Sequence, residues 1–485
     1  MDKKSLAISL VVGGTFLMEN IDGTVITTAM PDMAKSFGTD PIHMSIGVSS
    51  YIIMLAAFIP VSGWVAERFG VRRVFGTAIL GFTLSSILCG LSPNLSIFTL
   101  TRIIQGFFGA LMVPVGRLTV LRNTAKKDLV SAIAYITWPG LVGPIIGPFL
   151  GGFITTYFSW HWIFFINIPL GILAYYLAMR FVPKSDERSE EPLDVKGFIL
   201  CTSAMIGFMV GLEAFSNHLF ATEYTVALVL LSIVLFFLYY KHSNRVAKPM
   251  IDLGVLRIRT FAVTIYSGSL IRIIIGIAPF LTPLMFQVGF GLDAFQAGSL
   301  LMATMVGNLA MKPISVWVMR KWPFKSVLLV TTVLMSVGSL GMAYLFPDTP
   351  VWMIVFVLFF CGMARSMEFS CLNTLAFADV ETGKMHSANA LYSTVQQMTL
   401  GLGVTSGALM LQLANFIHGG DAVFQVADFQ LAFLMAAVLG LVTIFEFLKL
   451  KKDDGDHVRG LRIERHKDKV EQAATTFRRK RSARA

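Results

Sequence analysis

The sequence predicts an all-α membrane protein, and three observations support this fold class. First, 55% of the 485 residues are hydrophobic and only 14% are charged, and 40 Phe and 25 Met are too many for one soluble core. Second, apolar runs of about 20 residues recur along the chain, long enough to cross a hydrocarbon layer about 30 Å thick. Third, basic residues are distributed unevenly among the loops. Because lipid cannot satisfy backbone polar groups, each apolar run is expected to be helical.

The apolar runs predict 14 transmembrane helices. Several are longer than the hydrocarbon layer, so tilted helices or ends outside the membrane are expected. The expected bounds are 6–31, 44–66, 73–92, 97–120, 129–157, 161–182, 195–214, 224–242, 260–287, 294–319, 325–346, 351–374, 385–415 and 427–449.

The loop charges predict the orientation of these helices. With the N-terminus in the cytoplasm, cytoplasmic segments hold 34 of the 40 Lys and Arg residues, and the opposite side holds only Lys35. This asymmetry matches the positive-inside rule and predicts that both termini are cytoplasmic. The net charge of +11 is therefore a topology signal, and no nucleic-acid-binding module or nucleic-acid partner is expected.

A weak internal repeat predicts the domain organisation. The stretch "PVSGWVAERFGVRRVF" starts at Pro60, and "PISVWVMRKWPFKSVL" follows 253 residues later, at Pro313. Each copy ends a helix and enters a short basic loop, as expected for duplicated halves with a helix pair inserted between them. Repeated halves are common in secondary transporters, where the substrate binds between them. The expected units are a six-helix bundle at 1–190, inserted helices 7 and 8 at 191–245, a second six-helix bundle at 246–450 and a basic cytoplasmic tail at 451–485.

The first of these loops, "GWVAERFGVRR", combines small residues with a fixed pattern of charge. Gly63 is expected to allow close helix approach, and Gly70 a tight turn. The charged positions are Glu67, Arg68, Arg72 and Arg73. Such a loop can bind a neighbouring helix end in one conformation and release it in another, or it can simply set topology.

Four motifs in chain order resemble the major facilitator superfamily, and specifically its 14-helix drug:proton antiporter branch. The loop at 63–73 is similar to the family's loop signature, with Glu67 where Asp is usual. "RIIQGFFGA" on the fourth helix and "GPIIGPFLGG" on the fifth are similar to the family's helix-4 and antiporter motifs, and "WHWIFFINIPLG" and "NIDGTVITTAMP" resemble the same branch. The wording is particularly similar to MdtD-type multidrug exporters. The positions that carry the second and third motifs are Arg102, Gln105, Gly106, Gly109 and Ala110, then Gly143, Gly147, Pro148, Gly151 and Gly152.

The antiporter motif also has a direct physical interpretation. Gly143, Gly147 and Gly151 recur every four residues on one helix face, and such small faces let helices touch closely. Pro148 lacks a backbone amide donor, which favours a kink. A close-packed, kinked helix can rock against its neighbour and block leakage, or it can serve packing alone.

Two acids in the middle of the first helix are the main candidate coupling residues. A bare charge in lipid costs about 2.5–3.5 kcal/mol on insertion scales, so Glu19 and Asp22 are expected to face the bundle interior, to pair or to stay protonated. They are three residues apart and share a face. Burial and a neighbouring like charge favour the neutral form, so the pair can exchange protons and attract cations. The resemblance points to Asp22 as the usual acid; the alternative is a static partner for a buried Arg.

Intramembrane cations complete the set of candidate residues. Arg102 needs an acid on another helix, and either Glu19 or Asp22 fits. Arg117 is interpreted as an interfacial residue or as a partner of Glu67, and Arg272 is a candidate for the substrate path. Lys312 is expected to extend towards the interface, and Arg365 is expected to pair with Glu368, three residues along the same helix.

These observations predict a secondary transporter and not an enzyme. The resemblance implies proton-coupled export of amphipathic, often cationic compounds by alternating access across the bacterial inner membrane. The expected partners are a small-molecule substrate, protons and the lipid bilayer, with a monomer as the working unit and no metal or cofactor besides the proton gradient. The alternatives are a dedicated exporter of one metabolite, such as an amino acid, siderophore or sugar conjugate, and a non-transporting membrane sensor.

Overall fold

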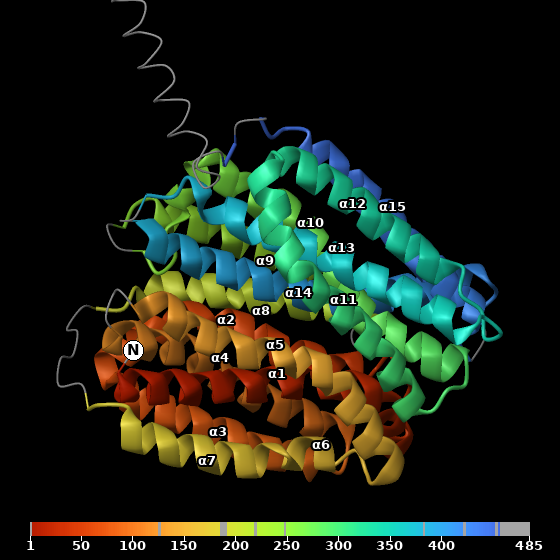
Figure 1. Ribbon diagram of the computed structural model, residues 1–485, viewed down its shortest axis with the longest axis horizontal. Coiled ribbons are helices and arrows are strands. Elements are labelled where there is room, and N and C mark those ends of the chain that lie inside the picture. The colour runs from red at the N-terminus through yellow and green to blue at the C-terminus, as the bar shows by residue number, and fades with distance from the viewer. Residues whose placement is uncertain are drawn as a thin grey trace, which may run out of the picture.

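The computed structural model shows an all-helical molecule, which confirms the predicted fold class (Figure 1). Thirteen helices in the described part of the chain are long and apolar enough to cross a membrane, and α5 adds the shorter apolar stretch Val142–Tyr157. The predicted tail at 451–485 lies almost wholly outside the described residues. The structure describes residues 2–124, 128–184, 192–217, 221–246, 249–381, 384–420, 423–451 and 454–455.

The long observed helices correspond one by one to the expected spans, with two spans subdivided, and a short 3-10 helix lies between the spans 224–242 and 260–287. The 161–182 span contains α6 and α7, and the 260–287 span ends in a π-helical turn, η3. The bounds are α1 Lys3–Phe37, α2 Ser45–Phe69, α3 Val71–Gly90, α4 Leu95–Asn123, α5 Leu129–Tyr157, α6 Trp162–Phe165, α7 Asn167–Phe181, α8 Val195–Asn217, α9 Thr222–Ser243, the 3-10 helix η2 Leu253–Arg257, α10 Arg259–Leu284, η3 Met285–Gly289, α11 Ala294–Lys321, α12 Phe324–Ala343, α13 Val351–Ala378, α14 Met385–Ile417 and α15 Val426–Phe447.

Helix α1 differs most from its expected length, because it continues past Pro31. Asp2 caps its start by accepting a hydrogen bond from the Ser5 amide, and Gly38 ends it with a left-handed φ of 64°. The end of the apolar run therefore does not mark the end of the helix. The left-handed glycine does, because only there does the backbone leave the helical conformation.

The helices form two groups, which we name the first bundle (α1–α7) and the second bundle (α10–α15). In Figure 1 the first bundle occupies the lower part of the molecule and the second the upper part. Within the first bundle α1 packs on α5 and α2 on α4, and within the second α11 packs on α13 and α10 on α14. The pair α8–α9 lies beside both, because α8 contacts α2 and α14.

The bundles meet at one end of the molecule, which we name the far end; there α1 joins α2 through residues 38–44. The Gln287 side chain donates to the Thr28 carbonyl at 3.0 Å, and the Phe295 amide donates to Thr156 Oγ1 at 3.1 Å. Helices α5 and α11 touch there so closely that a Cβ on Gly298 would lie 2.3 Å from the Pro148 oxygen. The far end is thereby closed.

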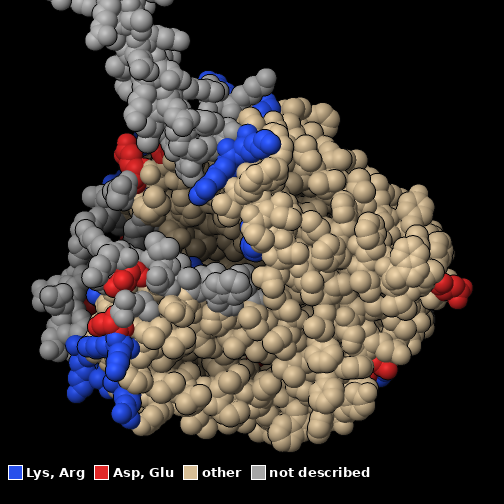
Figure 2. Space-filling model, in the orientation of Figure 1, with Lys and Arg blue, Asp and Glu red and all other residues tan. Residues whose placement is uncertain are grey.

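The opposite end, which we name the basic end, is where α2 joins α3 at residues 67–73. Figure 2 shows Lys and Arg gathered at this end, a hollow opening towards it, and Lys or Arg atoms on the wall of the hollow. The molecule is therefore closed at one end and hollowed at the other.

Candidate transport site

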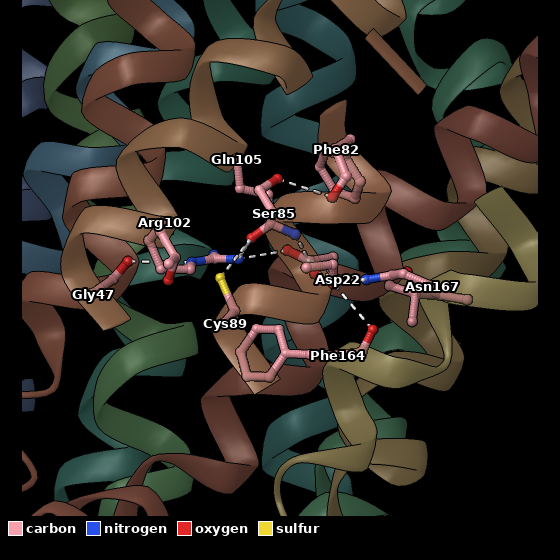
Figure 3. Close-up of polar contacts among 12 residues, drawn as sticks. Asp22, Gly47, Phe82, Ser85, Cys89, Arg102, Gln105, Phe164 and Asn167 are labelled. Carbon is pink, nitrogen blue, oxygen red and sulfur yellow. Dashed lines mark hydrogen bonds and ion pairs between the residues drawn. The ribbon is translucent and has the colours of Figure 1, made fainter. Parts of the chain in front are cut away.

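Asp22 lies at the centre of a buried polar cluster in the first bundle (Figure 3). Its side chain accepts three hydrogen bonds: from Arg102 Nη1 at 2.6 Å, from Gln105 Nε2 at 2.9 Å and from Asn167 Nδ2 at 2.8 Å. Asp22 is 3% exposed and the three donors are fully buried. Of the two expected acids, the structure thus selects Asp22 as the partner of Arg102.

The Arg102 guanidinium is held by more than its ion pair. Nη1 also bonds Gln105 Oε1 at 2.6 Å, Nε donates to the Gly47 carbonyl at 3.3 Å, and the Tyr51 ring lies 4.3 Å from the guanidinium carbon. One nitrogen, Nη2, has no hydrogen-bond partner within the part of the chain that the structure describes. A charge pair withdrawn from lipid is tolerated only with such additional hydrogen bonds, because they offset the loss of hydration.

Small residues allow the helices to reach this cluster. A Cβ on Gly106 would lie 2.4 Å from the Tyr51 carbonyl, so α4 can touch the backbone of α2 only because this residue is glycine. Asn167 begins α7 directly after the break at Ile166. Its amide also donates to Ser86 on α3, at 2.9 Å. Side chains of α4 and α7 therefore converge on the Asp22 carboxylate of α1, and α3 joins the network through Asn167.

Glu19 lies one turn from Asp22 but outside this cluster. It is partly exposed, and its Oε2 atom is buried without a hydrogen-bond partner. Arg117 on α4 is close enough to attract it electrostatically and stacks over the Phe16 ring at 5.4 Å. The structure thus places the two acids in different settings, with Asp22 fully bonded and Glu19 incompletely bonded.

Arg272 lies in the second bundle, apart from the other predicted coupling residues. It is fully buried on α10, donates to the Thr264 carbonyl at 3.1 Å and stacks 4.6 Å from the Tyr392 ring of α14. Its Nε and Nη2 atoms have no hydrogen-bond partner among the described residues. Tyr392 in turn donates to Asn373 Oδ1 on α13 at 2.5 Å, so Arg272 belongs to a polar chain that crosses three helices.

The expected Arg365–Glu368 pair is wrong. Glu368 is fully buried and accepts hydrogen bonds from Thr331 and Thr332 of α12. It therefore lies on the side of α13 that faces α12, whereas another side of α13 packs on α11. Lys312, expected to extend towards the interface, instead donates to Ser370 on α13 at 3.2 Å. Helical spacing alone could not show which neighbour each side chain would meet.

The loop at 63–73 is held by contacts within the first bundle. Glu67 pairs with Arg122 at 2.9 Å, so the interpretation of Arg117 as its partner is wrong. Arg72 donates to the Met179 carbonyl of α7, whereas Arg68 and Arg73 are exposed. Gly70 has a φ of 91°, which favours glycine at the turn. Gly63 does not permit a close approach, because a Cβ there would meet nothing within 4 Å.

The glycines of the antiporter motif face α1. A Cβ would lie 2.7 Å from Asn20 at Gly143, 2.0 Å from Thr24 at Gly147 and 2.4 Å from Thr28 at Gly151. At Gly152 it would lie 2.2 Å from the Ala294 oxygen of α11, and the Pro148 carbonyl accepts from Thr28 Oγ1 at 3.3 Å. The motif therefore brings α5 against a helix of each bundle.

Sequence reasoning missed three polar residues of these networks. Ser86 carried no signal beyond a polar side chain in an apolar span, and Asn167 lies within the quoted motif "WHWIFFINIPLG" but was not singled out. Glu213 did carry one, as a lone acid near the end of α8. It is 3% exposed and accepts from Ser45 of α2 at 2.7 Å and from Thr405 of α14, so one carboxylate bonds a helix of each bundle.

The fold and these sites define a polytopic transporter. The family model for the Major Facilitator Superfamily matches residues 12–404, and the chain belongs to this superfamily. It is a transporter and not an enzyme. It is similar to the "Putative multidrug resistance protein MdtD" of Escherichia coli O6:H1, with 35% identity over 92% of this chain and 95% of that protein. The protein of the same name from Serratia proteamaculans is 36% identical over 84% and 85% of the two chains.

Solved structures show the same fold at low sequence identity. The crystal structure of a D-xylose-proton symporter matches with a TM-score of 0.65 and 15% identity, over 93% of this chain and 98% of that one. A point mutant of the nucleoside transporter NupG matches with a TM-score of 0.62 and 17% identity, over 91% of this chain and 99% of that one.

Proposed function

We propose that this protein is a proton-coupled exporter of amphipathic, often cationic compounds across the bacterial inner membrane. It exchanges substrate for protons by alternating access, with the halves at 1–190 and 246–450 rocking about the inserted pair at 191–245. Both termini lie in the cytoplasm, so the hollow at the basic end faces the cytoplasm. The monomer is the working unit, and the proton gradient replaces any cofactor.

The observation that carries this proposal is the contrast between Glu19 and Asp22. Asp22 is locked by Arg102, Gln105 and Asn167, so its charge is already compensated. Among the described residues, Glu19 has a carboxylate oxygen without a donor, and Arg117 is the cation that attracts it. A carboxylate in this setting can bind a proton or a cation, but not both at once. Glu19 is therefore the proposed exchange site, and Asp22 the fixed element beside it.

The test is proton–substrate exchange in inverted vesicles that hold an inside-acid gradient. Cationic dyes and antibiotics are added singly, and the gradient is followed by fluorescence for the wild type, Glu19→Gln and Asp22→Asn at matched expression. Arg320→Gln, at an exposed position near the end of α11, is the control. We expect substrate-induced collapse of the gradient in the wild type and the control, and none with Glu19→Gln.

Each other outcome changes a different part of the proposal. Persistent collapse with Glu19→Gln keeps antiport and moves the proton site elsewhere. If no compound disturbs the gradient in the wild type, multidrug antiport is contradicted, and a dedicated exporter of one metabolite becomes the better interpretation.

A further inference from the structure

We propose that Lys312 of α11 and Arg365 of α13 form a binding site for an anionic group of the transported compound, such as a carboxylate, sulfonate or phosphate. This inference rests on the proposed transport function and narrows its substrate class. It assigns a role to two residues that the coupling proposal does not use.

Helices α11 and α13 run parallel and fix the two side chains relative to each other. Gly362 packs against the Thr304 carbonyl, where a Cβ would lie 1.9 Å away. One turn further, Ser366 donates to the Asn308 carbonyl at 2.8 Å, and one turn beyond that Lys312 donates to Ser370 at 3.2 Å. This ladder of contacts at every turn leaves the two helices little freedom to separate.

Neither cation has an acidic counterpart among the described residues. In that part of the chain, no ion pair involves Lys312 or Arg365, and the nearest acid along α13, Glu368, is bonded to threonines of α12. Arg365 also lies close enough to Lys312 for the two charges to repel. Two neighbouring cations of like sign in a low-dielectric region are unfavourable unless something negative joins them.

The depth of the two residues argues against a role at the interface. Arg365 lies about 20 Å from the basic end of α13 and Lys312 about 13 Å from that of α11, at about 1.5 Å per residue. Both remain partly exposed. Side chains of this length cannot reach the membrane surface from there, so two charged groups at this depth are expected to face the interior hollow rather than lipid.

The first bundle offers the complementary charge. Glu19 lies on α1 with an oxygen that lacks a donor. A compound with a cationic group for Glu19 and an anionic group for Lys312 and Arg365 would satisfy both bundles at once. Amphoteric amphipathic compounds are therefore the preferred substrates, ahead of simple lipophilic cations.

The experiment compares two dyes that differ only in one charge: a rhodamine with a free carboxylate, and its methyl ester, which is a pure cation. Binding to the purified full-length protein is measured by fluorescence polarisation, for the wild type, Lys312→Gln, Arg365→Gln and the control Arg320→Gln. We expect the wild type and the control to bind the carboxylate dye about tenfold more tightly than the ester, as for one charged hydrogen bond. Each site variant should lose this preference and keep its affinity for the ester.

The outcomes separate this inference from the proposed function. Equal or absent binding of the two dyes in the wild type overturns the anion site, as does a preference that survives in both site variants. A variant that loses affinity for both dyes equally, with unchanged thermal unfolding, also contradicts the anion site. Lys312 and Arg365 would then support binding of any compound, whatever its charge. Proton exchange with the ester alone, in vesicles, would retain antiport and discard the anion site. Export of the carboxylate dye without proton movement would retain the anion site and contradict antiport.

Discussion

The two bundles differ in whether their buried arginine has an acidic partner. In the first bundle, Arg102 meets Asp22 at 2.6 Å, and Gln105 and Asn167 complete the network. In the second, Arg272 is equally buried but contacts the Thr264 carbonyl and the face of Tyr392, and two of its nitrogens have no partner among the residues that the structure describes. The first bundle therefore carries its own counter-charge, whereas the second leaves positive charge uncompensated. The second bundle therefore presents uncompensated positive charge, whereas the first pairs Arg102 internally and leaves the Glu19 carboxylate incompletely bonded.

The largest expected effect on stability is in the first bundle, where Asp22 compensates the charge of Arg102. Asp22→Asn leaves Arg102 buried without its counter-ion, so we expect the free energy of unfolding to fall by about 3 kcal/mol. Thermal unfolding in detergent measures this change. The double variant Asp22→Leu with Arg102→Met should recover part of the loss, because neither charge then remains. A double variant no more stable than Asp22→Asn would contradict the proposed role of the ion pair.

A smaller effect is expected where α8 touches both bundles. Glu213→Ala leaves the Ser45 and Thr405 hydroxyls without their shared acceptor, at a cost of about 1–2 kcal/mol. Because Glu213 joins a helix of each bundle and bonds α2 at its first residue, beside the far end, we also expect that end to open more often. Thermal unfolding and far-side labelling of a cysteine introduced at Ile42, a buried residue between α1 and α2, report these two changes, with Glu223→Ala, in the exposed first turn of α9, as the matched control. No change relative to the control would show that Glu213 does not help to close the far end.

Arg272 provides the sharpest contrast with Arg102. Arg272→Met removes a buried cation that has no acidic partner in the described part of the chain, so relief from the burial of charge offsets the lost contacts. We therefore expect stability to change by less than about 1 kcal/mol. Arg102→Met, in contrast, should destabilise strongly, because Asp22 would remain buried without its cation. Chemical denaturation of both variants under the same conditions makes the comparison. Equal losses would show that the two bundles do not differ as proposed.

The smallest effect is expected at the surface. The Glu67–Arg122 pair is about two-fifths exposed on each side, so Glu67→Gln should lower stability by only about 0.2–1 kcal/mol. Salt weakens exposed pairs, so the difference from the wild type should shrink further in high salt. If transport falls much more than stability, the loop acts in the conformational cycle; if both are unchanged, it only sets topology.

The sequence by itself determined the membrane class, the helices and their order. Apolar runs long enough to cross lipid can only be helices, because lipid cannot satisfy an open backbone. The four-residue spacing of Gly143, Gly147 and Gly151 likewise indicated a close-packed face, since such a pattern is a property of one helix. The motifs at 63–73 and on the fourth and fifth helices were sufficient to indicate the superfamily.

Only the tertiary structure decided which charges meet. Spacing placed Glu19 and Asp22 on one face, but the rotation of α1 against α4 decided that Asp22 binds Arg102 and that Glu19 faces Arg117. Spacing also suggested that Arg365 and Glu368 pair, but Thr331 and Thr332 on α12 provide closer donors to the acid. Partners on other helices depend on helix rotation and depth, and neither is written in the periodicity of a single helix. The sequence therefore identified the buried charges, and packing determined which of them are compensated.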